Sequence, residues 1–157
     1  DENVKRLSKA TFDAAEYIVD IAKKEGLVDG LEKLEGSVSL HLACHARAQN
    51  MGPKAAEMLR LIPDTKVEVI ERCSGHGGSW GIMKDNFDTA IKIGRPAARK
   101  ALESKAAYVV SECPLAREHM MQGIEKLDDE NKAGAIQAVQ HPIQILAKAY
   151  GLNSGEK

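Results

Sequence analysis

Three short segments with the residue pattern of β-strands recur along the chain, and each ends at a cysteine that is followed by a turn. They occupy residues 37–44, 66–73 and 107–113. Segments of this length, rich in valine and other apolar residues, predict β-strands. The stretches between them are long enough to hold helices, so successive strands should run parallel. We therefore predict an α/β fold in which about three strands form a small parallel sheet flanked by helices.

Apolar periodicity and helix-ending residues locate the expected helices. Residues 3–24 have apolar positions at helical spacing and predict one amphipathic helix that stops at Gly26. Residues 27–36 contain two glycines and are expected to connect this helix to the first strand. Further helices are expected at residues 52–61, at 84–104 with interruptions at Gly94 and Pro96, at 114–126, and from His141-Pro142 onward.

The chain length suits one domain. We expect the 157 residues to form a single α/β domain, 1–157. Within it, residues 1–35 are the N-terminal helix and connector, 128–132 a solvated break and 152–157 a frayed tail.

Composition excludes several classes of protein. The net charge of −1 argues against nucleic acid or acidic lipid as the main partner. No apolar run approaches the length of a membrane span, and the charged N-terminus lacks the apolar core of a signal peptide. We therefore expect a cytoplasmic location, in which the three cysteines are reduced.

The three cysteines are expected to gather in one place. Right-handed crossovers bring the carboxyl ends of parallel strands to one edge of the sheet, where α/β proteins carry out their chemistry. Cys44, Cys73 and Cys113 all fall at this edge, and converging thiolates suit zinc or an iron–sulfur cluster. His45 and His76 follow the cysteine turns and are the expected candidates for a fourth ligand; an exogenous ligand is the alternative.

Glycine and arginine residues surround the cysteines. Gly75, Gly77 and Gly78 let the backbone approach a cofactor closely and point N–H groups at it. Such donors stabilise an anionic cluster and raise its potential. Arg47 and Arg72 flank two of the cysteines and are expected to offset thiolate charge.

Three further side chains are expected to have structural roles. His41 lies within a predicted strand and is expected to be a hydrogen-bonded core histidine. Trp80 is expected in the core, with a lid over the site as the alternative. His119 is expected on the surface of its helix.

The residues around the cysteines resemble the cysteine-rich CCG domain found in heterodisulfide reductase subunits. Relatives in that family include the iron–sulfur subunits of anaerobic glycerol-3-phosphate dehydrogenase and glycolate oxidase. The family pattern is a lone Cys, then Cys-Cys-Gly, then Cys-x-x-Cys, and the chain matches it with Cys44, Cys73-Ser74-Gly75 and Cys113-x-x-Ala116. The match is strongest to the glycerol-3-phosphate dehydrogenase branch, over residues 44–49 and 71–81, and the resemblance extends from about residue 10 to 150.

This resemblance implies an oxidoreductase component that relays electrons through an iron–sulfur cluster of the [4Fe–4S] type. The implied redox partner is a flavoprotein, a quinone-linked protein or a di-iron protein. In the full pattern five cysteines hold a non-cubane cluster, whereas Ser74 and Ala116 stand at two of those positions here. Ser74 is a weak ligand compared with a thiolate, and Ala116 cannot bind iron. Family members often carry two such domains and a ferredoxin-like segment, so a partner subunit or a preceding N-terminal domain is expected.

Other interpretations of the cysteines remain open. Two of them could cycle between dithiol and disulfide without metal, or zinc could hold the fold of an interaction domain. Haem with a His or Cys axial ligand is a further alternative. Each cysteine could also be a small buried apolar residue. Visible absorption and metal analysis distinguish these cases.

Overall fold

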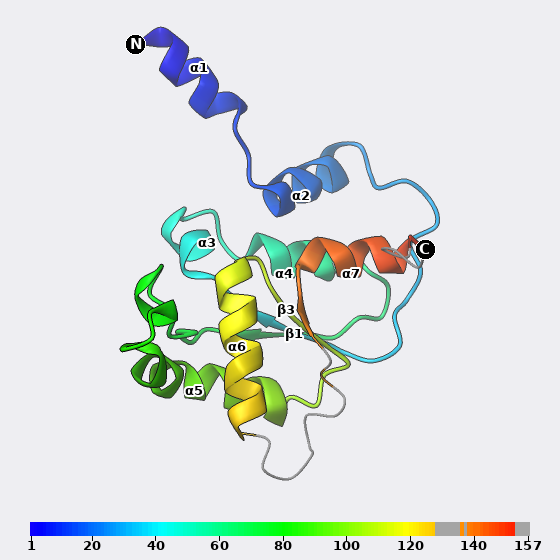
Figure 1. Cartoon of the computed structure of the whole chain (residues 1–157). Helices are drawn as coiled ribbons and strands as arrows, with labels where there is room; N and C mark the ends of the chain where they lie inside the picture. The colour runs from blue at the N-terminus through cyan, green and yellow to red at the C-terminus, as the bar shows by residue number, and fades with distance from the viewer. Residues whose placement is uncertain (128–135, 137, 153–157) are drawn as a thin grey trace.

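Four parallel strands form the sheet in the computed structural model, which describes residues 1–127, 136 and 138–152 (Figure 1). The strands are β1 (Val38–His41), β2 (Val67–Ile70), β3 (Tyr108–Ser111) and β4 (Val139–Gln140), in the order β2-β1-β3-β4. The predicted parallel α/β fold is confirmed, with one strand more than expected. Because β4 has only two residues, it is too short to give an alternating pattern that sequence reasoning could detect.

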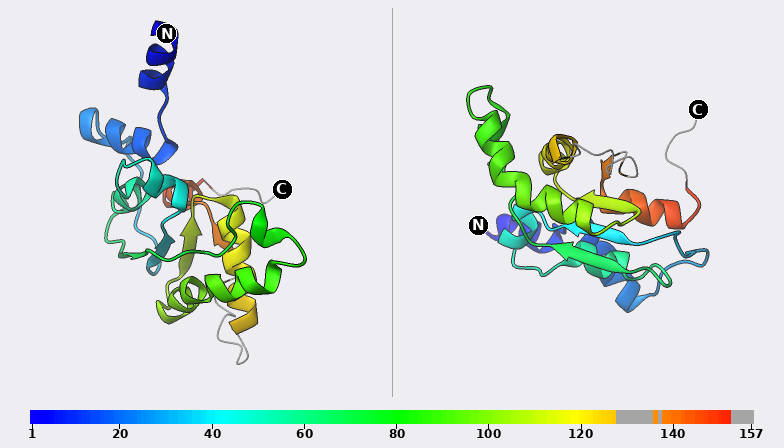
Figure 2. Two further views of the ribbon diagram at one scale, coloured as in Figure 1. Left: turned by 90° about the vertical axis from the view of Figure 1, so that its left-hand side faces the viewer. Right: turned by 90° about the horizontal axis from the view of Figure 1, so that it is seen from below.

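Helices cover both faces of this sheet (Figure 2). They are α1 (Glu2–Ala10), α2 (Ala14–Lys24), α3 (Cys44–Ala48), α4 (Lys54–Leu59), the 3₁₀ helix η1 (Trp80–Ile82), α5 (Phe87–Glu103), α6 (Pro114–Leu127) and α7 (Pro142–Ala149). On one face, Leu40 and Val110 pack in a cluster with α2, α4 and α7. On the other face, Ile70 and Val109 pack in a cluster with α5 and α6. Met120, at 1% exposure, fills this second interface.

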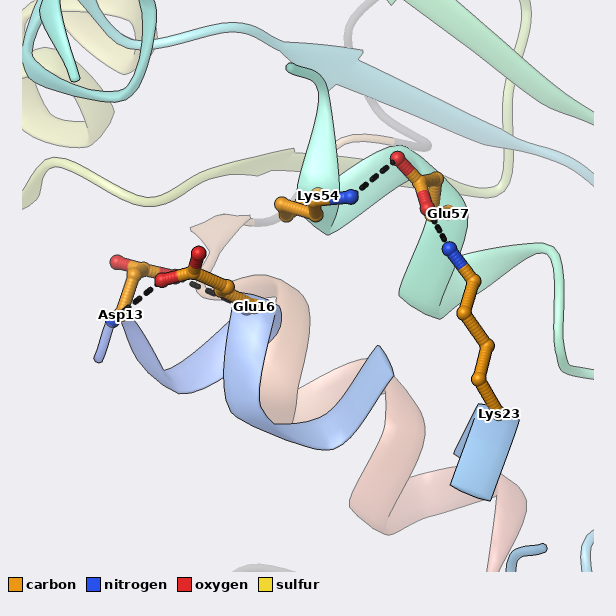
Figure 3. Close-up of polar contacts among 5 residues, drawn as sticks. All are labelled: Asp13, Glu16, Lys23, Lys54 and Glu57. Atoms are coloured by element: carbon orange, nitrogen blue, oxygen red, sulfur yellow. Dashed lines mark hydrogen bonds and ion pairs between the residues drawn. The ribbon is translucent and has the colours of Figure 1, made fainter. Parts of the chain in front are cut away.

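The single helix predicted over residues 3–24 is wrong, because the chain breaks into α1 and α2. Asp13 caps α2 by accepting hydrogen bonds from the Ala15 and Glu16 amides, and the Glu16 carboxylate accepts one from the Asp13 amide (Figure 3). This reciprocal capping box stabilises a helix start in the middle of the apolar periodicity. The helix α1 projects away from the sheet and buries no residue (Figure 1).

The helix α2 lies against α4 through apolar and ionic contacts. Ala15 and Val19 are buried in the first core cluster. Lys23 of α2 and Lys54 of α4 both pair with the Glu57 carboxylate, at 3.0 and 2.9 Å (Figure 3). These two ion pairs hold the pKa of Glu57 below its ordinary value.

The predicted interruption at Gly94 and Pro96 is also wrong, because α5 is continuous over its 17 residues. Ala97, Ala98 and Ala101 are completely buried against the sheet and α6. This packing outweighs the backbone hydrogen bond that a proline inside a helix removes.

The remaining predicted elements are placed as follows. The final helix starts where expected, with His141 as the N-cap of α7 and Pro142 in its first turn. The predicted solvated break at 128–132 lies outside the described residues, as does the predicted tail except for Leu152, which is exposed. In the part of the chain that the structure describes, no helix is both long and apolar enough to span a membrane.

Candidate metal centre at the carboxyl edge of the sheet

The three cysteines follow three adjacent strands at nearly equivalent positions. The sheet register aligns His41, Ile70 and Ser111, the last residues of β1, β2 and β3. Cys44 and Cys73 each lie three residues after their strand, and Cys113 lies two residues after its strand. Neighbouring strands in a sheet are about 4.8 Å apart. The fold therefore brings the three thiol loops to one edge, with the β1 loop in the middle.

The thiols are accessible rather than part of the core. Cys44 and Cys73 are exposed, Cys113 is half-buried, and all three are free. The interpretation as small buried apolar residues is therefore wrong for Cys44 and Cys73. Cys44 also does not lie in a turn, because it is the first residue of α3.

The loop after β2 directs a backbone donor at its own cysteine. The Gly75 amide donates to the Cys73 Sγ at 3.3 Å. Gly75, Gly77 and Gly78 have φ values of 90°, 52° and 65°, which are left-handed conformations that favour glycine. A Cβ on Gly75 would overlap the Ala90 carbonyl oxygen, so only glycine lets this loop lie so close to α5.

His76 connects this loop to the third cysteine. Its Nδ1 accepts a hydrogen bond from the Gly78 amide at 3.0 Å, which assigns the ring proton to Nε2. The Nε2 atom lies 3.8 Å from the Cys113 Sγ and can donate to it. Of the two histidines predicted as ligands, His76 is thus the one that the structure brings against a thiol.

His41 ties all three strand ends together, as expected for a core histidine. It is 1% exposed. Its Nε2–H donates to the Arg72 carbonyl at 2.9 Å, and its Nδ1 accepts from the Ser111 hydroxyl at 3.0 Å. Burial holds the pKa of His41 below its ordinary value, so the ring is neutral. The neutral ring fixes the starts of the second and third cysteine loops relative to β1.

The prediction that His119 lies on the surface is wrong. His119 is 2% exposed and its Nδ1–H donates to the Ser74 carbonyl at 2.6 Å. Its Nε2 has no hydrogen-bond partner among the described residues. The buried positions of α6 include Ala116, Met120 and Gly123, and a histidine at position 119 continues that apolar stripe. This periodicity was the signal that could have identified a second histidine supporting the Cys73 loop.

Glu112 is a site-edge residue that sequence reasoning missed. It directly precedes Cys113, is 8% exposed, and its Oε2 has no partner in the described structure. Burial, with a smaller contribution from the Asp13 charge, raises the pKa of Glu112 to about 7. A carboxylate directly after a strand was the available signal for Glu112.

His141 directly follows β4, and its pKa is lowered by burial and by the Arg117 charge.

The other predicted site residues lie on exposed surface. His45 and Arg47 lie on α3, and Arg72 lies just before Cys73; all three side chains are exposed. Neither arginine forms an ion pair with a described residue. Trp80 is 41% exposed, so its predicted place in the core is wrong; it lies on η1, outside both core clusters.

The side chains at this edge are of the type that holds iron–sulfur clusters, because cysteine thiolates are the usual ligands. Three thiols share one edge, and a backbone N–H already points at one sulfur. Within residues 1–127, 136 and 138–152, however, no three His, Cys, Asp or Glu side chains converge closely enough to hold a metal ion. A shared centre therefore requires the three thiol side chains to turn toward one another.

Comparison with known proteins finds a matching family and several distant relatives. A family model described as "Cysteine-rich domain" (CCG) matches residues 38–117, which include all three thiol loops. A subunit of the anaerobic glycerol-3-phosphate dehydrogenase of Escherichia coli K12 is 29% identical over 126 residues, covering 80% of this chain and 29% of its own length. No solved structure matches the chain.

Two archaeal relatives are similarly distant. An uncharacterised iron–sulfur protein of Methanocaldococcus jannaschii is 27% identical over 133 residues, covering 83% of this chain and 27% of its own length. One subunit of the dihydromethanophenazine:CoB–CoM heterodisulfide reductase of Methanosarcina acetivorans is 26% identical over 145 residues, covering 88% of this chain and 33% of its own length. The chain thus spans about a third or less of the relatives it matches.

Proposed function

Because the chain belongs to the cysteine-rich CCG domain family, we propose that it is an iron–sulfur component that relays electrons within an oxidoreductase complex. Two of its relatives are named as oxidoreductase subunits and another as an iron–sulfur protein. The observation that carries the proposal is the placement of three free thiols after three adjacent strands, with the Gly75 amide donating to one sulfur.

Cys44, Cys73 and Cys113 are the proposed iron ligands. A bound cluster would supply one-electron chemistry at this edge. His76 has two candidate roles, as a fourth ligand or as a donor to the Cys113 sulfur. The 3.8 Å contact from its Nε2 to that sulfur supports the donor role. His45, on exposed α3, is the other candidate ligand.

We propose a [4Fe–4S] cluster with three protein thiolates. The two positions at which the family pattern has further cysteines are occupied by Ser74 and Ala116, which are 2% and 1% exposed. The buried Ala116 has no donor atom, so a fourth iron needs His76, His45 or an exogenous ligand. Five-thiolate ligation is therefore not part of the proposal.

The surrounding protein groups would set the reduction potential. The Gly75 amide donates to Cys73 and would spread the negative charge of a thiolate-bound cluster. The exposed Arg47 and Arg72 side chains add positive charge near the first and second cysteines. Both effects favour the reduced, more negative state and so raise the potential.

The proposed redox partner is a flavoprotein, a quinone-linked protein or a di-iron protein. The chain spans only 27–33% of the three relatives described above. Further segments or a partner subunit would therefore complete the electron path to a substrate.

The proposal is tested by the visible and electron paramagnetic resonance spectra of anaerobically purified protein. We expect broad visible absorption from the cluster and a resonance signal on reduction with dithionite. Cys73→Ala should lose both, whereas Ser79→Ala, on the same exposed loop, should retain them. Stoichiometric zinc without colour would support the zinc alternative, and three titratable thiols without metal would support the dithiol alternative.

A further inference from the structure

A cleft along α5 concentrates positive charge beside the Cys73 loop. Its volume is about 470 Å³. Five of the chain's 22 Lys and Arg residues line it, whereas Glu103 is the one acidic residue in its lining among the described part of the chain. The five cations are Arg72, Lys92, Arg95, Arg99 and Lys100. This local excess contrasts with a net charge of −1 for the whole chain.

The positive charge of the cleft is not neutralised by the described part of the protein. All five cations are exposed, and none forms an ion pair there. Arg95 and Arg99 are four residues apart on α5, a spacing at which like charges destabilise a helix. An acidic partner would relieve the repulsion between these two arginines.

The cleft is directly connected to the candidate centre. Arg72 immediately precedes Cys73, and its carbonyl oxygen is bound by His41. The same helix that carries the cations also supports the Cys73 loop, because Ala90 and Gly94 lie against Gly75. A protein bound in this cleft would therefore lie next to Cys73.

We propose that this basic cleft docks an electron-carrier protein with a carboxylate-rich surface, which exchanges single electrons with the centre. This inference rests on the proposed function. From Lys92 to Lys100 the cations extend about 12 Å along the helix axis, which exceeds the size of a single phosphate group. Charge complementarity over such a stripe speeds and orients protein association.

Exposed apolar side chains supply the second component of such an interface. Trp80, Ile82 and Met83 are 41%, 57% and 58% exposed, on and just after η1, which packs against α5. Aromatic residues and methionine are enriched in the centres of protein interfaces. These side chains lie near the start of α5, outside the lining of the cleft.

The proposed electron transfer is a single-electron exchange. The reduced carrier would lose one electron and become oxidised, and the proposed centre held by Cys44, Cys73 and Cys113 would gain that electron. No covalent bond forms or breaks. The cleft would only hold the two redox centres near each other.

The test uses plant-type ferredoxin, an acidic [2Fe–2S] protein, as the probe. Its binding to the wild-type chain should weaken about tenfold when the ionic strength rises from about 20 to about 200 mM, because salt screens the contacting charges. Arg95→Glu/Arg99→Glu should weaken binding at low salt at least about tenfold. The matched control Lys33→Glu/Lys66→Glu changes the net charge equally, at exposed positions outside the cleft, and should change binding less than about twofold.

Three results would overturn the docking proposal. They are equal losses in the two double variants, salt-independent binding, or saturable binding of inorganic pyrophosphate or duplex DNA without binding of ferredoxin. If Arg95→Glu/Arg99→Glu does not fold by circular dichroism, Arg95→Gln/Arg99→Gln replaces it. Ferredoxin binding needs no bound cluster, whereas reduction of the centre by reduced methyl viologen, which gives up one electron, needs no docking. In the wild-type chain, failure of only the viologen reaction would therefore contradict the proposed function, and failure of only ferredoxin binding would contradict the docking proposal.

Discussion

Gly75→Ala should destabilise the protein more than any ordinary substitution in an exposed loop. Gly75 has a φ of 90°, where an L-residue with a Cβ costs about 1–2 kcal/mol. The new Cβ would also overlap the Ala90 carbonyl oxygen and lie 2.7 Å from the Gly94 amide nitrogen. Forcing extra atoms into a packed site typically costs a further 1–3 kcal/mol or so. The total expected loss of unfolding free energy is about 2–5 kcal/mol.

Gly78→Ala is the matched control for this prediction. Gly78 also has a positive φ, of 65°, but a Cβ there would meet no atom within 4 Å. It should therefore cost only the conformational part, about 1–2 kcal/mol. For a chain of this length 1 kcal/mol corresponds to about 2–4 °C in Tm.

Urea unfolding followed by far-ultraviolet circular dichroism measures both variants. We expect Gly75→Ala to be at least about 1 kcal/mol less stable than Gly78→Ala, because overpacking alone costs that much. It should also bind less iron, since the Cys73 loop must move off α5. Equal stability of the two variants would refute the inferred contact between this loop and the helix.

Three further predictions concern the residues around the loops. Neutral His41 contributes fully to the free energy of unfolding above about pH 6.5. This contribution is lost as the pH falls toward the lowered pKa of the folded state, because the unfolded chain then binds more protons. Urea unfolding between pH 5 and 8 should therefore show an unfolding free energy that rises with pH, and His41→Gln should reduce this slope by up to about 1.4 kcal/mol per pH unit. His119→Phe leaves the buried Ser74 carbonyl without its hydrogen-bond donor and should lower the unfolding free energy measured in urea by about 1–3 kcal/mol. The control Glu118→Gln, at an exposed position, should change it by less than about 0.5 kcal/mol. Equal losses would contradict the hydrogen bond between His119 and Ser74. Cys73→Ala should reduce bound iron to background by metal analysis, and full retention would exclude this residue as a ligand.

The sheet and its cysteine edge could be predicted because strong local patterns encode them. Each of the three longer strands contains valine and other strand-favouring residues, and each crossover is long enough for a helix. Parallel connectivity then fixes where the strand ends meet. The two-residue β4 carries no comparable pattern, since its pairing depends on the neighbouring β3 rather than on its own sequence.

The errors in the candidate site arose where tertiary contacts override local patterns. The burial of His119 follows from a contact with Ser74, 45 positions away in the sequence. The continuity of α5 through Pro96 follows from packing of its alanines against the sheet and α6. The break at Asp13, by contrast, had a local signal, a capping box with Glu16 that the apolar periodicity concealed.

The most direct test of an iron–sulfur centre at this edge is the content of iron and acid-labile sulfide in the anaerobically purified chain. We predict about four of each per chain, as a [4Fe–4S] cluster requires. Both should fall together when Cys44, Cys73 or Cys113 is replaced by alanine. Absence of both iron and sulfide under these conditions, with the chain folded, would contradict the claim that its three thiols hold an iron–sulfur centre.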